Sequence, residues 1–135
     1  MKIITNLKTI YFMPQKLVLI IDDDNRNIFA LKAVLKSKGY GCLSAPSAQE
    51  GFSIIENSGK VSVVLMDMMM PDMDGYQAMA AMKKSENMRN IPVLAVTAQA
   101  MVGDKERCLS AGASGYVSKP IDVDELILQI EEVTK

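Results

Sequence analysis

The fold of this chain is decided by residues 63–75, Val-Val-Leu-Met-Asp-Met-Met-Met-Pro-Asp-Met-Asp-Gly. An apolar run that begins at Val61 stops abruptly at Asp67, and Pro71 and the pair Asp74–Gly75 then signal a loop. This pattern is typical of a buried strand that presents one carboxylate at its C-terminal end. In open parallel α/β sheets, ligand and catalytic groups collect at the carboxyl ends of the strands. Asp67 is therefore the first candidate for a functional residue.

Short apolar runs and segments with helical spacing alternate along the rest of the chain. Ile28, Leu31 and Leu35 recur at helical spacing before Gly39, a residue that commonly ends a helix. The Ser47-Ala-Gln-Glu50 pattern is a capping box that opens a second helix. This alternation implies a parallel sheet covered by helices on both faces. We predict strands over Leu17–Ile21, Gly41–Ala45, Val61–Met66, Ile91–Val96 and Gly115–Ser118, and helices over Asn25–Lys38, 47–57, Tyr76–Lys84, Met101–Ala111 and from Asp122 onward.

The composition limits the classes of function. A chain of 135 residues fits one domain. Its net charge of -1 and its lack of a Lys/Arg run give no electrostatic reason for direct nucleic-acid binding. No apolar run approaches the roughly 18 residues of a membrane span, so we expect no membrane insertion. The sequence contains 0 His residues, which removes Ser-His and Cys-His nucleophiles and the commonest zinc ligand.

The ends of the chain and the two cysteines complete this picture. Cys42 and Cys108 lack metal-ligand spacing, and we expect them to be free thiols in a reducing compartment, the cytoplasm. Residues 1–15 lack a sustained apolar core and a cleavage site, so a secretory signal is not expected there. We interpret residues 1–15 as a dispensable N-terminal extension and residues 16–135 as the folded domain.

Polar residues follow or end four of the predicted strands: Asp22 and Asp23, Asp67, Thr97 and Lys119. If the first and third strands are neighbours, as in the flavodoxin-like order, the three carboxylates meet at one point of the sheet edge. Their mutual repulsion would be resolved by a divalent cation, and oxygen ligands favour Mg²⁺ or Mn²⁺. Asp67 would then be a nucleophile toward a phosphoryl group, with Lys119 and the Thr97 hydroxyl contacting phosphoryl oxygens.

The chain resembles the response-regulator receiver domains of two-component signalling over about residues 16–134. The resemblance rests on four motifs in order: Ile-Ile-Asp22-Asp23, Met-Asp67-Met-Met-Met-Pro-Asp-Met-Asp-Gly75, Val-Thr97-Ala and Ser-Lys119-Pro120. It implies a flavodoxin-like (βα)₅ three-layer sandwich with a five-stranded parallel sheet in the order 2-1-3-4-5.

The resemblance also implies roles for individual residues. Asp22, Asp23, Asp67 and the Met69 carbonyl would hold Mg²⁺, and Asp67 would become an aspartyl phosphate. The Lys119–Pro120 peptide bond would be cis. Thr97 would move toward the phosphoryl group while Tyr116 changes rotamer, which would remodel the face made by the fourth helix, the fifth strand and the fifth helix. The module would catalyse only its own phosphorylation and slow dephosphorylation.

Partners follow from the same resemblance. Without His, the chain would receive phosphate from a sensor histidine kinase or a His-containing phosphotransfer protein. The remodelled face would bind a downstream protein, and the domain would be a monomer or a phosphorylation-promoted dimer. Receivers tune hydrolysis with the residues two positions after the phosphorylated Asp and after the Thr, here Met69 and Gln99. Met69 cannot orient a water by a strong hydrogen bond, so we expect a long-lived phosphoryl group.

Three alternatives remain open at this point. A dehalogenase-like phosphatase could use residues 22–24 as its Asp-x-Asp pair, but it would leave the residues after Asp67 unexplained. A flavin-binding module would share the fold, although no Ser/Thr/Gly-rich phosphate loop follows the first strand. A phosphate-independent interaction module on the same fold is the third. Tyr116 also has a simpler interpretation as a packing residue.

Overall fold

The computed structural model describes residues 15–98 and 101–135 of the chain. Its strands are β1 (Leu17–Ile21), β2 (Gly41–Ala45), β3 (Val63–Asp67), β4 (Val93–Thr97) and β5 (Gly115–Ser118). Its helices are α2 (Asn25–Ser37), α3 (Ala48–Ser58), α4 (Gly75–Lys83), α5 (Asp104–Ser110) and α6 (Val123–Val133). Gln99 and all of the predicted N-terminal extension except Gln15 lie outside the described residues.

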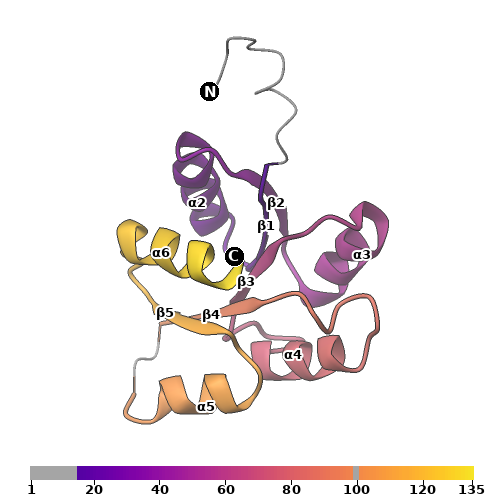
Figure 1. The fold of residues 1–135 in the computed structure, drawn as a ribbon. Helices are drawn as coiled ribbons and strands as arrows, with labels where there is room; N and C mark the ends of the chain where they lie inside the picture. The colour runs from indigo at the N-terminus through magenta and orange to yellow at the C-terminus, as the bar shows by residue number, and fades with distance from the viewer. Residues whose placement is uncertain (1–14, 99–100) are drawn as a thin grey trace.

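The strands form one parallel sheet in the order β2-β1-β3-β4-β5, which confirms the predicted fold class. Strands β3 and β4 are buried throughout because helices cover both of their faces. Figure 1 shows α2 and α6 on one side of the sheet and α3 and α4 on the other. The carboxyl ends of β1 and β3 are neighbours, since Ile21 pairs with Met66.

The two faces of the sheet carry different core side chains. Under α3, α4 and α5 the core is rich in methionine, with Met66, Met68, Met70, Met79, Met82 and Met88 all buried. Under α2 and α6 the buried residues are mainly Val, Leu and Ile. Tyr116 and Tyr76 pack against the methionine side.

The boundaries of several elements correct the sequence-based predictions. Strand β3 begins at Val63 and β4 at Val93, each two residues later than predicted, and both continue one residue further. Helix α5 begins only at Asp104 because Gly103, with φ of 86°, adopts a left-handed conformation just before it. Within the described ranges, no helix combines the length and the hydropathy that a membrane crossing requires.

The pair Asp74–Gly75 opens a helix and is not a loop turn. The Asp74 carboxylate accepts a hydrogen bond from the Gln77 N–H, and the Gln77 side chain accepts one from the Asp74 N–H. This reciprocal capping box starts α4 one residue earlier than predicted. The buried face of α4 contains Ala78, whereas Ala80 is exposed.

Candidate functional site

Two neighbouring strands bring three carboxylates together at the edge of the sheet. Asp22 follows β1 directly, and Asp67 is the last residue of β3. One carboxylate oxygen each from Asp22, Asp23 and Asp67 lies within 4.8 Å of the others. Asp22 and Asp67 are only 3% and 5% exposed, whereas Asp23 is exposed. The cluster therefore has a buried base and one side open to solvent.

Hydrogen bonds from the chain fix the two buried carboxylates. Asp22 accepts one bond from the Asp24 N–H at 2.8 Å and another from the Asn27 side-chain amide at 2.5 Å. Asp67 Oδ1 accepts a bond from the Met69 N–H at 3.1 Å. Sequence reasoning missed Asn27, because nothing distinguishes it from any other polar residue in the first turn of α2.

Lys119 follows β5, and its side chain reaches the cluster along the carboxyl edge of the sheet. Its Nζ lies 3.6 Å from Asp22 Oδ2 and 4.0 Å from Asp67 Oδ1. The Lys119 backbone N–H donates to the Thr97 carbonyl at 2.8 Å, which extends the pairing of β5 with β4 up to the lysine. The Lys119–Pro120 peptide bond is cis, the geometry that the resemblance implies.

The environment makes it costly to ionise Asp67. Burial raises the pKa of its carboxyl to about 6, and the nearby Asp22 carboxylate contributes to this rise, while the Met69 N–H bond and Lys119 oppose it. The single positive charge of Lys119 does not balance the negative charges of three carboxylates. A divalent cation would supply the missing positive charge, and carboxylate oxygens are the ligands that Mg²⁺ prefers. The donor set therefore fits Mg²⁺.

Thr97 and Tyr116 lie on the neighbouring strands, beyond Asp67. Thr97 ends β4 and is 2% exposed, and Tyr116 lies in β5. The Tyr116 hydroxyl donates to Asp104 Oδ2 on α5 at 3.0 Å. Asp104 is a second residue that sequence reasoning missed, since its role depends on how α5 packs against the sheet.

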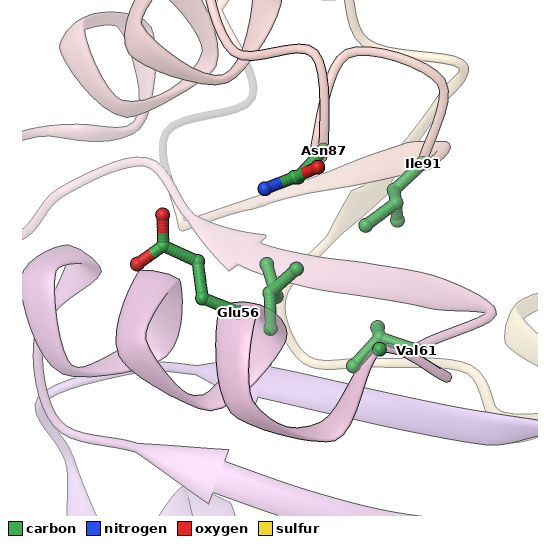
Figure 2. A pocket seen from close by; sticks show the side chains of 6 residues that line it. Glu56, Val61, Asn87 and Ile91 are labelled. Atoms are coloured by element: carbon green, nitrogen blue, oxygen red, sulfur yellow. The ribbon is translucent and has the colours of Figure 1, made fainter.

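A groove lies beside the carboxylates, and a separate cavity lies away from them. A groove of about 180 Å³ beside the acidic cluster is lined in part by Met69, Thr97 and Arg107. The cavity in Figure 2, of about 320 Å³, is lined in part by Val61 and Ile91, which precede β3 and β4. It thus lies at the opposite edge of the sheet from Asp67 and is not part of this site.

Comparison with known proteins identifies the family. The model of the response regulator receiver domain matches residues 18–131. The chain belongs to the response-regulator receiver domain family. It is therefore a receiver domain of two-component signalling, a signalling module without metabolic enzyme activity. Receiver domains bind Mg²⁺ at their acidic site, which corresponds here to Asp22, Asp23 and Asp67.

Relatives and solved structures agree with this assignment. The polar-differentiation response regulator DivK of Brucella ovis is 34% identical over 116 residues, covering 86% of this chain and 94% of DivK. The receiver domain of the sensor histidine kinase PA1611 from Pseudomonas aeruginosa PAO1, which holds a magnesium ion in its active-site cleft, is 30% identical with a TM-score of 0.80. The alignment covers 90% of this receiver domain and 98% of that one. A CheY-like receiver domain protein from Methanospirillum hungatei is 31% identical with a TM-score of 0.77, at 88% and 93% coverage.

Proposed function

We propose that this receiver domain accepts a phosphoryl group on Asp67 in a two-component phosphorelay. The observation that supports this most directly is the meeting of three carboxylates and the Lys119 ammonium at the carboxyl ends of the strands. The donor would be a phosphohistidine on a sensor histidine kinase or a His-containing phosphotransfer protein, since this chain has 0 His of its own.

Asp67 is favoured over Asp22 as the phosphoacceptor because its oxygens are less occupied. N–H groups of described residues donate to both oxygens of Asp22, but only to Oδ1 of Asp67. The remaining lone pairs of Asp67 can attack phosphorus in line. The new O–P bond then forms as the N–P bond of the phosphohistidine breaks, and the departing imidazole keeps the bonding electron pair.

The surrounding groups would lower the barrier to this transfer by balancing charge. Mg²⁺, held by Asp22, Asp23, Asp67 and the Met69 carbonyl, would neutralise charge on the phosphoryl oxygens. Lys119 would pair with another phosphoryl oxygen, and the Thr97 hydroxyl would donate a hydrogen bond to a third. The two cationic neighbours would also keep Asp67 ionised at neutral pH, as a nucleophile must be.

The response would be a shift between two conformations of the face made by α5, β5 and α6. Thr97 would move toward the phosphoryl group and Tyr116 would change rotamer. The remodelled face would bind a downstream protein, as a monomer or as a phosphorylation-promoted dimer. Met69 and Gln99 would set the rate of hydrolysis, and we expect it to be slow.

We also propose that residues 16–135 fold and accept phosphate without residues 1–15. The supporting observation is that β1 begins at Leu17 and that the family match begins at residue 18. A protein truncated before Lys16 should show the same unfolding midpoint in urea as the full chain.

The experiment that tests the function is the intact mass of the protein after incubation with Mg²⁺ and acetyl phosphate or phosphoramidate. We expect one added phosphoryl group in the wild type and none in Asp67→Asn or in the presence of EDTA. Asp72→Asn is the matched control, because Asp72 is an exposed acid in the segment that follows β3 and should leave the yield unchanged. A normal phosphoryl yield on Asp67→Asn would show that another residue is the acceptor.

A further inference from the structure

Tyr116 is held by hydrogen bonds from two different helices. Its hydroxyl donates to Asp104 Oδ2 on α5 at 3.0 Å. Its backbone N–H donates to Gln129 Oε1 on α6 at 3.1 Å, and its carbonyl accepts from Gln129 Nε2 at 2.8 Å. Tyr116 thus connects both helices of the proposed signalling face to the strand between them.

Gln129 takes the place of a neighbouring strand. Strand β5 is the last in the sheet order, so the outward backbone groups of Tyr116 have no strand partner. The side-chain amide of Gln129 binds both groups, as a peptide group of an added strand would. Gly115 makes the close approach possible, because a Cβ there would lie 2.4 Å from Gln129 Oε1. The backbone at Tyr116 is therefore fixed on its outer side.

Asp104 acts on the other end of the residue, the ring. The phenol–carboxylate bond is charge-assisted and stronger than a bond between neutral groups. It ties the ring to the first turn of α5. Any rotation of the ring away from α5 must break this bond, whereas the bonds to Gln129 involve only the backbone and can persist.

We propose that Gln129 and Asp104 are positioning residues for Tyr116, with Gln129 fixing its backbone as a pivot and Asp104 holding its ring toward α5. The switching role of Tyr116 in this inference rests on the proposed function. The three hydrogen bonds that position Tyr116 do not depend on that function. Loss of the Asp104 carboxylate then makes rotation of the ring easier, and loss of the Gln129 amide loosens the strand edge.

The contribution of Asp104 can be tested with a double-mutant cycle. The variants are Asp104→Ala, Tyr116→Phe and the double variant, with Glu106→Ala, an exposed acid on the same helix turn, as the control. The first readout is the apparent affinity for beryllofluoride with Mg²⁺, a stable analogue of the phosphoryl group. We expect Asp104→Ala to tighten this affinity by about three- to tenfold, less than a fully buried bond to a charge would give. When Tyr116→Phe is already present, the same change should have no effect.

A second readout does not depend on phosphoryl chemistry. In protein labelled with ¹³C at the tyrosine Cζ, the Tyr116 signal should shift in Asp104→Ala and remain in place in Glu106→Ala. Weaker beryllofluoride binding in Asp104→Ala, an equal effect in the presence of Tyr116→Phe, or an unchanged Tyr116 signal would each overturn the role of Asp104. If the wild type binds no beryllofluoride, the proposed function fails while the Cζ signal still decides whether Asp104 holds the ring.

Gln129 is tested by hydrogen exchange of the Tyr116 backbone amide. Gln129→Ala should accelerate this exchange at least about tenfold, because the amide loses its acceptor. Gln129→Glu keeps the acceptor but places an oxygen against the Tyr116 carbonyl, so it should give an intermediate rate. Gln49→Ala, at an exposed position of α3, serves as the control. Unchanged exchange in Gln129→Ala would show that Gln129 does not fix the strand.

Discussion

Replacing Asp67 by Asn should stabilise the metal-free protein, although it removes the proposed phosphoacceptor. Burial, with a smaller contribution from Asp22, raises the Asp67 pKa from 3.8 to about 6. Since a shift of one pKa unit corresponds to about 1.4 kcal/mol, ionised Asp67 reduces the free energy of unfolding at neutral pH by at most about 3 kcal/mol, and solvent at the open side of the cluster lowers this figure. Asparagine carries no charge, and its Oδ1 can still accept the Met69 N–H bond.

The pH dependence of this difference has a definite sign. Because the pKa is raised in the folded state, the favourable contribution of Asp67 is present below its unfolded pKa and is lost as the pH rises through about 6. The free energy of unfolding of Asp67→Asn should therefore exceed that of the wild type by about 1–3 kcal/mol at pH 7.5, and by less than about 1 kcal/mol at pH 4. Between pH 4 and pH 7.5, the free energy of unfolding of the wild type should therefore fall relative to that of the variant.

Urea unfolding in EDTA at several pH values measures both the stability difference between Asp67→Asn and the wild type and its dependence on pH. Asp72→Asn serves as a control at an exposed position. Addition of Mg²⁺ should reverse the trend at pH 7.5, because binding to the folded state stabilises the wild type more than a variant that lacks one carboxylate ligand. Equal or lower stability of Asp67→Asn at pH 7.5 in EDTA would refute the reasoning. It would mean that Lys119 already compensates the buried charge.

Three further substitutions test other parts of the structure. Lys119→Met should slow phosphorylation by acetyl phosphate at least about tenfold, because the incoming phosphoryl group loses the cationic side chain that lies 4.0 Å from Asp67 Oδ1. An unchanged rate would remove Lys119 from the mechanism. Gly75→Ala should lower the free energy of unfolding in urea by about 1–3 kcal/mol, since the added Cβ would lie 2.2 Å from Met68 Sδ and 2.9 Å from Met68 Cα. Unchanged stability of this variant would show that the contact relaxes freely. Asp24→Ala should lower the free energy of unfolding by about 1 kcal/mol, because it removes the N-cap of α2. The phosphoryl yield should stay intact, and a lost yield would point to a direct role of Asp24 in the site.

The sequence predicts the parts of the site that depend on topology alone. Asp22, Asp67 and Lys119 could be placed together because the carboxyl ends of the strands of a parallel sheet share one edge, and the end of an apolar run is easy to recognise. The strand bounds Leu17–Ile21, Gly41–Ala45 and Gly115–Ser118 were correct for the same reason. Short strands that end in charged or turn residues leave little freedom in their register.

The parts that the sequence did not reveal depend on how helices dock on the sheet. Asn27, Asp104 and Gln129 all lie on helices, and their contacts are fixed by the rotation of each helix about its own axis. The spacing of hydrophobic residues predicts that rotation only approximately. The sequence therefore does not show which of the polar residues on one helix face contacts the sheet. The capping box at Asp74 was overlooked for another reason: the Asp–Gly pair is as typical of a turn as of a helix start.

The unequal composition of the two core layers bears on where the protein can deform. Methionine side chains are unbranched and have several soft torsions, so a layer built from them can refill space at small cost. Val and Ile have few rotamers and resist such change. The ring of Tyr116 packs on the methionine layer, while the branched layer supports the strands from behind. A rearrangement of the Tyr116 ring would therefore be accommodated by the methionine layer at lower cost than by the branched layer.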